Sequence, residues 1–371
     1  MPGADIPREQ VMAWRIARHG LHRDTSTLTA LRVLDLGVQE ALAGSHRVAL
    51  AARLPTGATL HDPGLALVWA QRGAPHLLRR AELPTHAARL YPHNDADAAA
   101  RLGTPFTRSL RAAHIAPLAA FARAAAALRH VVREEIPRAQ ASTEMTAALP
   151  PAYSADCAPC ACRHVFGSVF QAAGIAAGVE VLSGRPARLA PLPNRHDLPE
   201  TAAGDLVADY LAVHGPATPG DLAGYLDTTH TVVKKTMWPA HLVTVRVHGR
   251  DTFLPEPDIA ELLDAPDATE IVRLLPPMDP LLQGRDRELL VPDPQRRKQV
   301  WRIIGNPGAV LAGAEIAGMW RPKVSGKRLD ITVTMFDTTP ARVRTAVETE
   351  ADTVAAARGL ESARVRFDQP T

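Results

Sequence analysis

Long apolar runs are missing from this chain of 371 residues, and none approaches the ~20 residues of a membrane-spanning helix. The first twenty residues carry charges too early, and an apolar run too short, for a secretory signal peptide. Cysteine is scarce as well: the three cysteines, Cys157, Cys160 and Cys162, are crowded together, which argues against a disulfide framework. We therefore expect a cytoplasmic protein that does not contact membranes.

Lysine is nearly absent, with five residues among the 42 that are lysine or arginine. A genome rich in Ala, Arg and Pro codons explains this bias without any function. Arginine nevertheless suits phosphate contacts through its planar fork of donors. The net charge of +3 is small, but a chain near neutrality can still carry one basic face.

The remaining composition is that of an ordinary globular protein, with 46% hydrophobic and 22% charged residues. The length predicts two to four domains rather than one small core. The fold class that the patterns below predict is α+β.

Residues 205–260 give the strongest local pattern. The segment DLVADYLAVHGPATPGDLAGYL predicts two helices, the second capped by Thr218, with Pro219 at its first position and Asp221 near its positive end. A short helix over 229–238 follows. LVTVRVHGRDTFLP then predicts a hairpin with its turn at 248–251. Three helices and a hairpin predict a winged helix-turn-helix.

The same order recurs upstream, as expected of an array of similar units. Helices predicted over 117–133, 138–148 and 163–175 precede GVEVLSGRPARLAPLP, which predicts a second hairpin. A looser copy opens the chain, with helices over 8–19, 27–36 and 44–53 followed by LALVWAQRGAPHLLRRAEL.

The last hundred residues differ in character, since they are rich in strand formers punctuated by Gly and Pro. They predict a small β-barrel or curved sheet, with a short basic helix at PQRRKQVWRIIG between its strands. The tail over 340–371 predicts a helix and one edge strand, ARVRF.

Basic side chains cluster at two predicted turns. The loop WRPKVSGKR places Arg321, Lys323, Lys327 and Arg328 around a Ser-Gly tip, which suits a phosphate backbone or a minor groove; a solvated loop is the alternative. In AQRGAPHLLRR, His76 lies beside Arg72 and Arg79, where it could touch phosphate or substrate, although a lone histidine is usually structural. Winged helices can also serve as protein-docking modules.

The segment CAPCACRH has part of a zinc-ligand spacing in Cys157, Cys160 and His164. A structural site needs a fourth ligand, and Cys162 would crowd one ion. We therefore predict a turn lined by thiols that leads into the helix over 163–175, with no metal and no cofactor.

Taken together, these segments resemble the AlkZ/YcaQ family of winged-helix DNA glycosylases. The resemblance covers nearly the whole chain, and its order and spacing are more specific than any one segment. The segments are LGVQ (36–39) with GSHRVALAARL, RGAPHL (72–77), the Cys157/Cys160/His164 stretch, HGPATPGDLAGYL (214–226), LLPPMDPLLQGRDRELLVPD (274–293) and GAVLAGAEIAGMWRP (308–322).

The resemblance implies tandem winged helices plus a β-barrel around a basic concave surface for duplex DNA. It also implies hydrolysis of the N-glycosidic bond of bulky or crosslinked N7-alkylated guanine, without a metal, in DNA repair or in self-resistance to alkylating agents. The expected partner is double-stranded DNA, the expected state a monomer, and the location the cytoplasm, on the nucleoid when DNA is bound.

Family members carry a Gln-x-Gln or Gln-x-Asp motif, and Gln39 matches its first position. The second position is Ala41, where an amide or carboxylate is expected. Glu40 has suitable chemistry in the neighbouring register, and His46 is another candidate. The predicted catalytic residues are Gln39 and Glu40. The candidate substrate- or DNA-binding residues are His46, Arg47, Arg72, His76, Arg79, Arg321, Lys323, Lys327 and Arg328.

These patterns predict four parts: winged-helix units over 1–104, 105–197 and 198–260, and a β-barrel-like domain over 261–371. The leading functional hypothesis is a monofunctional DNA glycosylase. Because of Ala41, the second hypothesis is a non-catalytic DNA-binding protein, either a regulator or one that sequesters an alkylating metabolite. A protein-interaction scaffold is the third.

Overall fold

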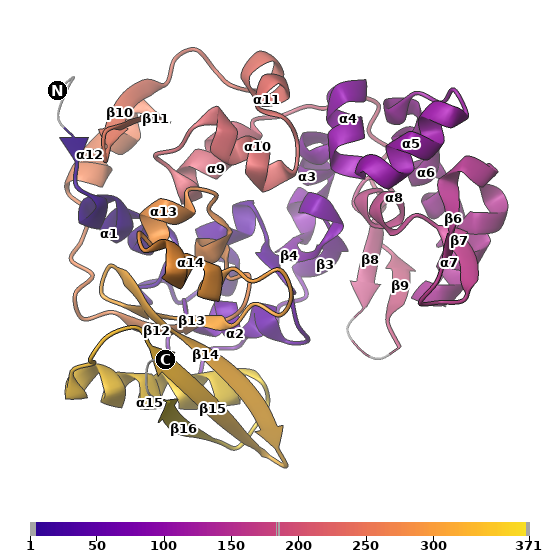
Figure 1. Cartoon of the computed structure of the whole chain (residues 1–371). Helices are drawn as coiled ribbons and strands as arrows, with labels where there is room; N and C mark the ends of the chain where they lie inside the picture. Colours follow the sequence, from indigo (N-terminus) through magenta and orange to yellow (C-terminus); the bar gives the residue numbers. More distant parts are fainter. Residues whose placement is uncertain (1–4, 183, 185, 369–371) are drawn as a thin grey trace. The chain divides into compact units, whose positions relative to one another are not determined.

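The computed structural model describes residues 5–182, 184 and 186–368. The predicted α+β class is confirmed, and the chain divides into two compact units (Figure 1). The first comprises Met1–Asp62, Ala208–Asp221 and Pro239–Thr371, and the second Pro63–Val207 and Leu222–Trp238. Helices α9 (Leu206–His214) and α10 (Pro219–Leu226) contain residues of both. No helix in the described ranges combines the length and the apolarity that crossing a bilayer requires.

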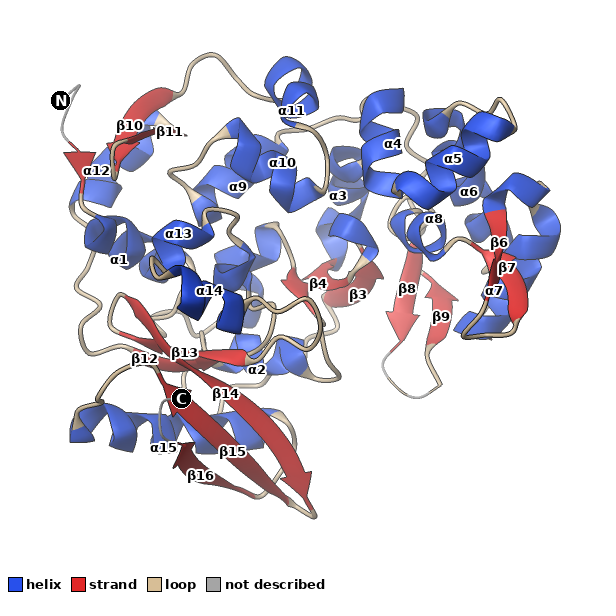
Figure 2. Ribbon diagram, in the orientation of Figure 1, coloured by secondary structure: helices blue, strands red, loops and turns tan. Residues whose placement is uncertain are grey.

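An open five-stranded sheet forms the C-terminal part of the first unit (Figure 2). Its strands, in spatial order, are β12 (Val272–Leu275), β13 (Gly308–Ala312), β14 (Glu315–Ser325), β15 (Arg328–Met335) and β16 (Ser362–Asp368). Helix α15 (Ala341–Ala357) connects β15 to β16, which pair in parallel, and its valines pack on the sheet. In the described part of the chain the two edge strands pair only with their inner neighbours, so an open sheet takes the place of the predicted β-barrel.

Two glycines of the segment GAVLAGAEIAGMWRP lie where the sheet has no room for a side chain. A Cβ at Gly308 would lie 2.3 Å from the Trp320 ring, and one at Gly318 would lie 2.6 Å from the carbonyl oxygen of Thr334. The indole of Trp320 is buried and donates a hydrogen bond of 2.8 Å to the carbonyl of Leu275. The glycines therefore allow strands and a large ring to pack more closely than any side chain would permit.

A smaller sheet of the first unit contains β1 (Asp5–Ile6), β10 (Val243–Val247) and β11 (Arg250–Leu254). The predicted hairpin is confirmed: Val247 pairs with Arg250, and the two turn residues, His248 and Gly249, both have positive φ. That conformation is the one that matches the twist of a two-residue hairpin. The other elements of this unit are α1 (Arg8–Arg18), η1 (Leu28–Ala30), η2 (Arg32–Asp35), β2 (Val38–Gln39), α2 (Ser45–Ala51), α12 (Glu256–Leu263), η6 (Pro280–Gln283), α13 (Arg287–Leu290) and α14 (Pro294–Val300).

Three arginines hold the C-terminal end of α2. Arg53 donates to the carbonyl of Ala49 (2.7 Å), Arg23 to that of Ala51 (3.1 Å) and Arg273 to that of Ala52 (3.1 Å). The last carbonyls of a helix have no hydrogen-bond partner within the helix and carry its negative partial charge. Arginine stabilises them in two ways, by donating hydrogen bonds and by placing a positive charge beside them.

Buried ion pairs connect this helix end and α1 to the segment over 276–287. Arg53 and Asp279 are both 0% exposed and meet through two hydrogen bonds of 2.7 and 2.8 Å. Arg15 makes a similar two-bond contact with Asp286, at 2.6 and 3.0 Å, and also donates to the carbonyls of Gly215 and Pro216. Neither arginine can be left unpaired in such surroundings without a large desolvation cost.

The second unit combines a sheet with a helical layer. Strands β4 (Pro75–Arg79), β3 (Leu65–Trp69), β8 (Val179–Leu182), β9 (Arg188–Pro191) and β5 (Ile136–Pro137) are neighbours in that order, and β6 (Ser154–Cys157) pairs with β7 (Cys162–Val165). The turn predicted between β8 and β9 includes Ser183 and Arg185, which lie outside the described residues. The remaining elements are η3 (Gln71–Gly73), η4 (Arg80–Glu82), α3 (Leu83–Leu90), α4 (Asp95–Leu102), α5 (Thr104–Ala112), α6 (Pro117–Val131), α7 (Arg138–Ala148), η5 (Pro151–Tyr153), α8 (Gly167–Ala172) and α11 (His230–Thr236).

The helix predicted over 27–36 is wrong, and the one predicted over 163–175 is shortened to α8. The segment over 27–36 forms two 3-10 turns separated by an extended Leu31, and it buries Leu28, Leu31 and Leu34, a spacing of three that fits 3-10 rather than α geometry. The segment over 163–175 begins as strand β7, because the backbone N–H of Val165 donates to the hydroxyl of Thr146 and its neighbours pair with β6.

The elements of the strongest predicted winged helix occur in the predicted order: α9, α10, α11 and then the β10–β11 hairpin. Thr218 and Asp221 form the expected cap reciprocally, with the N–H of each donating to the side chain of the other, at 2.8 and 3.2 Å. The division into three winged-helix units and a β domain, with the boundaries given above, stays a prediction.

The buried pair of Arg53 and Asp279 yields a stability prediction. Replacing Asp279 by alanine strands a buried guanidinium, so we expect the free energy of unfolding to fall by about 3–5 kcal/mol in urea denaturation. The matched control is Glu270→Ala, which removes the partner of Arg342 in a pair whose side chains are 83% and 58% exposed. That variant should unfold like wild type. An Asp279→Ala protein as stable as the control would contradict the role given to the pair.

Candidate active-site turn and nucleic-acid interface

The turn between β2 and α2 carries Gln39 and is closed by a single hydroxyl. Ser45 Oγ accepts hydrogen bonds from the backbone N–H groups of Ala41 (2.9 Å) and Leu42 (3.2 Å), and its own hydroxyl lies 3.5 Å from the carbonyl of Gln39. Gly44, at φ 78°, supplies the left-handed residue that the turn needs before α2 begins. Gln39 is half-buried at the end of β2.

Glu40 forms a hydrogen-bonded contact with His46 within this turn. Its carboxylate contacts Nδ1 of His46 and also accepts the backbone N–H of Gly44 at 3.2 Å. Burial alone would raise the pKa of Glu40, but the hydrogen bond and charge of His46, with the Gly44 N–H, outweigh it and leave the pKa below its usual value. Glu40 is therefore a carboxylate that stays ionised at neutral pH.

Ala41, at the second motif position, brings only its backbone N–H to the turn. Gln39, Glu40 and His46 share one short segment of the chain, and the structure adds the contact between Glu40 and His46; the catalytic roles of these residues stay predictions. Arg47 follows in α2 as an exposed side chain that lines a hollow of about 400 Å³ together with residues 55–61 and the end of α15.

The three candidates of the RGAPHL turn lie in the second unit. Arg72 donates to the carbonyl of Tyr225 at 2.6 Å and lies over the ring of that tyrosine, and Arg79 pairs with Glu82 at 3.0 Å. His76 is fully buried, and its Nδ1 donates to the carbonyl of Ala74 at 2.9 Å. Contacts of these three residues with DNA or substrate stay predictions.

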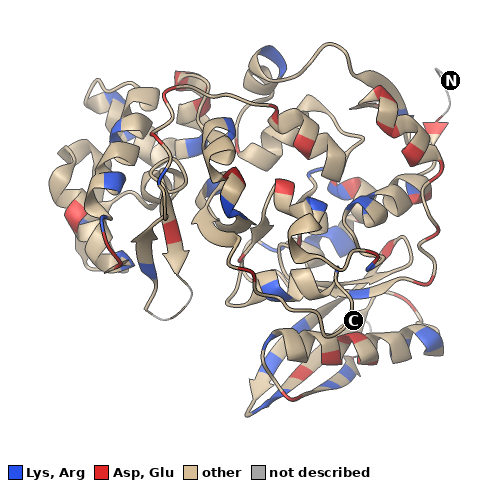
Figure 3. Ribbon diagram, turned by 180° about the vertical axis from the view of Figure 1, so that it is seen from behind, with Lys and Arg blue, Asp and Glu red and all other residues tan. Residues whose placement is uncertain are grey.

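The four cations predicted around the turn of the β14–β15 hairpin are all exposed. The blue of lysine and arginine recurs along this hairpin in Figure 3. Lys327 pairs with Glu361 at 2.5 Å and Arg328 with Asp330 at 2.9 Å, both on the surface. Arg321 donates to the carbonyl of Gly305 at 3.1 Å. Lys323 has no ion pair among the described residues, so its charge faces solvent.

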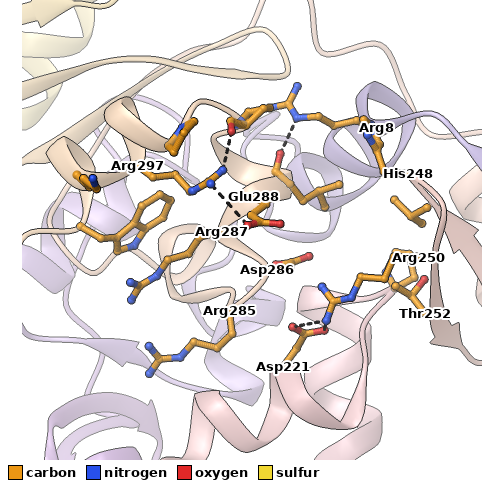
Figure 4. A pocket seen from close by; sticks show the side chains of 17 residues that line it. Arg8, Asp221, His248, Arg250, Thr252, Arg285, Asp286, Arg287, Glu288 and Arg297 are labelled. Atoms are coloured by element: carbon orange, nitrogen blue, oxygen red, sulfur yellow. Dashed lines mark hydrogen bonds and ion pairs between the residues drawn. The ribbon is translucent and has the colours of Figure 1, made fainter.

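A cavity of about 940 Å³ in the first unit gathers arginines that no sequence pattern marks as a site (Figure 4). Six cationic side chains line it, against three acidic ones: Arg8, Arg250, Arg285, Arg287, Arg297 and Lys298, with Asp221, Asp286 and Glu288. The signals in the sequence are the RDR triplet at 285–287 and the basic helix over 294–300. Neither of them points to a ligand by itself.

Among the arginines of this cavity, Arg287 has the least compensation of its positive charge by nearby carboxylates. Its pKa is lowered by burial and by the neighbouring charge of Arg285. The guanidinium stacks on the ring of Trp301, with 5.1 Å to the ring centroid. Arg250, by contrast, is held 3.2 Å from Asp221, and Arg297 lies 3.5 Å from Glu288 (Figure 4). An anion placed between Arg285 and Arg287 would relieve their repulsion.

The cysteine segment forms the tip of the β6–β7 hairpin. Cys157 faces Cys162 in the register of the two strands, and Sγ of Cys157, Sγ of Cys160 and a ring nitrogen of His164 lie within 4.8 Å of one another. A hydrogen bond from His164 lowers the pKa of the Cys157 thiol. The spacing in the sequence groups these three residues, and the structure brings them together.

Comparison with known proteins identifies the family. The family model described as "DNA glycosylase AlkZ-like" matches residues 29–357. The chain belongs to the AlkZ-like DNA glycosylase family. The predicted family is thereby confirmed, and membership implies DNA as a partner.

A solved structure of this family has the same fold. The DNA glycosylase AlkZ of Streptomyces sahachiroi superposes with a TM-score of 0.74 at 22% sequence identity, covering 98% of this chain and 100% of that one. The search of curated proteins returned no match. At this identity the likeness extends to the fold of the AlkZ-like chain and not to its substrate.

His76 yields a prediction on pH. Burial, with a smaller contribution from the charge of Arg72, lowers the pKa of His76 to about 3. The unfolded chain takes up this proton near pH 6.5 and the folded chain does not, so stability is lost as pH falls below about 6.5. Between pH 7 and pH 5 this histidine should cost about 2 kcal/mol of unfolding free energy.

The measurement is urea denaturation at both pH values for wild type, His76→Asn and His130→Gln. Asparagine can still donate to Ala74, so the His76 variant should lose about 2 kcal/mol less than wild type on acidification. His130 is exposed, and its variant should follow wild type. Equal acid losses in all three proteins would refute the assignment.

Proposed function

We propose that this AlkZ-like protein is a monofunctional DNA glycosylase that binds duplex DNA and hydrolyses the N-glycosidic bond of a bulky or crosslinked N7-alkylguanine. The observation that carries the proposal is the presence of Gln39, at the first motif position of the family, in a turn whose backbone is fixed by Ser45. The protein would act on chromosomal DNA in the cytoplasm.

The proposed chemistry asks little of an acid catalyst. Alkylation at N7 makes guanine a cation, so it departs as a neutral base without being protonated. The sugar develops oxocarbenium character, and the enzyme must hold a water in line and stabilise the positive charge. The Gln39 amide can both accept from and donate to a water, although it cannot take its proton at neutral pH.

Glu40 and His46 supply what Ala41 lacks. Since the carboxylate of Glu40 accepts at Nδ1 of His46, that nitrogen carries a proton, and Nε2 is the ring atom that remains for the attacking water. Such a nitrogen can accept the proton of the attacking water, while the ionised Glu40 orients the ring and adds negative charge near the sugar. The pair thus replaces the second amide or carboxylate of the motif in this proposal.

DNA would be bound through phosphates at two places. The repulsion between Arg285 and Arg287 favours an anion in the cavity of the first unit, where Trp301 holds the Arg287 guanidinium flat. The exposed hairpin tip adds Lys323 and its neighbours. Contacts of this kind fix the register of a duplex without reading its sequence.

Ala41 also favours a second candidate function, a DNA-binding protein that has kept the scaffold but not the chemistry. Formation of abasic sites in alkylated duplex DNA supports the enzyme. Binding to the same duplex without excision supports the second function, and absence of DNA binding supports an interaction scaffold.

The excision assay on N7-alkylguanine duplexes tests the proposed roles. We expect Gln39→Ala to slow excision by ~10² or more with little change in lesion-DNA affinity, since water positioning acts on the transition state. Glu40→Gln and His46→Gln should each slow it too. Ala41→Gln, which rebuilds the family motif, should match or exceed wild type.

Glu270→Ala is the matched control for excision, because it removes an exposed ion pair with Arg342 and touches none of the candidate site residues. No excision by wild type or by Ala41→Gln on any lesion, with duplex binding retained, would rule out the enzyme. A Gln39→Ala variant with the wild-type rate would remove Gln39 from the mechanism.

The hairpin makes a separate prediction on binding. Replacing Lys323 and Lys327 by alanine should weaken binding to any duplex about equally. The slope of log K against log salt should become shallower by up to ~0.9 for each phosphate that the variant no longer neutralises. Arg342→Ala/Arg344→Ala, on the exposed face of α15, provides a control with the same charge change. An unchanged slope in the hairpin variant would exclude this loop from the interface.

A further inference from the structure

The tip of the β6–β7 hairpin brings together two thiols and an imidazole that could bind a metal ion and that the proposed DNA chemistry does not use. We propose that Cys157, Cys160 and His164 bind one Zn²⁺ ion, with water in the fourth position. The sequence alone favours no metal, since Cys162 would be needed as a ligand and would crowd the ion. The structure brings Cys157, Cys160 and His164 together without Cys162, so a water molecule can complete the coordination.

The separations suit a tetrahedral ion. Bonds of about 2.3 Å to sulfur and 2.0–2.1 Å to nitrogen put neighbouring ligand atoms of a tetrahedral zinc about 3.5–3.8 Å apart. The three ligand atoms here already lie within 4.8 Å of one another. Closing the difference needs side-chain movements of about 1 Å, and Cys160 is exposed, so its rotamer is not held by packing.

The ring of His164 is oriented as a zinc ligand requires. Its Nδ1 lies 2.8 Å from the carbonyl oxygen of Val165. A carbonyl can only accept, so Nδ1 carries the proton and Nε2 of the neutral ring keeps its lone pair for a metal. A hydrogen bond from the second ring nitrogen to a backbone carbonyl is the usual support of a metal-bound histidine.

The base of the hairpin is rigid, so the ligands are presented on a fixed frame. Arg163 donates to the hydroxyl of Ser154 (3.0 Å) and to the carbonyls of Pro151 (3.0 Å) and Ser154 (2.9 Å). The Thr146 hydroxyl of α7 accepts the N–H of Val165 at 2.8 Å. Ala161, at φ 50°, turns the chain sharply between the two strands. Binding therefore orders little more than three side chains.

The ligand types decide the class of metal. Two thiolates and an imidazole select a soft or borderline ion such as Zn²⁺ over Mg²⁺ or Ca²⁺, which prefer oxygen. The ion would join the two strands across their turn and hold the tip in one conformation. The ion would lie apart from the residues proposed for glycosylase activity, and the proposal does not depend on that activity.

The test uses the full-length chain, purified under reducing conditions, stripped with a chelator and titrated with Co²⁺ and then with Zn²⁺ in competition. We expect one ion per chain and the thiolate-to-cobalt absorption of a tetrahedral site. Cys160→Ser and His164→Ala should each weaken binding at least about 100-fold, and His164→Cys, which restores a ligand, should recover it. Zinc should also protect the hairpin from proteolysis in wild type but not in Cys160→Ser.

Cys162→Ser is the matched control, a thiol on the same hairpin that the proposal leaves unbound, and it should bind like wild type. The exposed tip allows all four variants to fold, which circular dichroism checks. Substoichiometric binding by wild type, or equal weakening in Cys162→Ser and Cys160→Ser, would overturn the site. So would a Cys157–Cys160 disulfide that persists in reductant and excludes the metal.

Discussion

The buried contact between Arg53 and Asp279 is the constraint on which the first unit depends. Two charges at 0% exposure can be kept only as a pair, so the end of α2 and the segment over 276–287 must meet in one geometry. Arg15 and Asp286 impose the same condition from α1. One end of this network holds α2, whose first turn carries the Glu40–His46 contact. The other end carries Arg285 and Arg287 into the basic cavity. A core of aliphatic side chains could give equal stability. It would not fix the positions of the Glu40–His46 turn and of Arg285 and Arg287 as closely, because apolar contacts lack the directional geometry of two-bond arginine–carboxylate pairs.

Local chemistry predicted the parts of the fold that it controls. The turn at His248 and Gly249, helix α7 over 138–148 and the tail of α15 and β16 follow from turn residues, helix formers and a strand pattern, and the structure contains all three. The failures share a cause that lies outside the local sequence. Leu28, Leu31 and Leu34 take a 3-10 spacing because all three are buried, and Val165 is in a strand because Thr146, nineteen residues away, accepts its N–H. The helices α3, α4 and α5 were missed although each has an apolar face, because none is longer than nine residues and Pro and Gly residues interrupt the stretch that forms them.

The candidate site was predicted in its residues but not in its contacts. The resemblance to the family singled out Gln39, and the structure adds that Glu40, one residue on, turns toward His46 rather than standing beside Gln39 as a second arm. That geometry depends on the left-handed Gly44 and on Ser45, whose hydroxyl accepts two backbone N–H groups. The spacing of residues in the sequence does not predict this turn. The arginine cavity could not be predicted for a similar reason. Its lining residues come from segments far apart in the sequence, and their charges form a possible binding site only where the fold brings these segments together.

For the proposed glycosylase reaction, the absence of an amide or carboxylate at Ala41 is small in energy beside the other contributions to the rate. A positioning group contributes a factor of ~10², about 2.7 kcal/mol, whereas enzymes commonly lower barriers by about 8 kcal/mol or more. For a cationic leaving group the departing base supplies much of the driving force, and fixed negative charge near the sugar supplies more. An ionised carboxylate at Glu40, held in place by His46 and the N–H of Gly44, is such a charge. In the proposed mechanism, a turn that keeps Gln39 and this carboxylate directs the water by other means and retains the electrostatic part of the chemistry, which accounts for the larger part of the barrier.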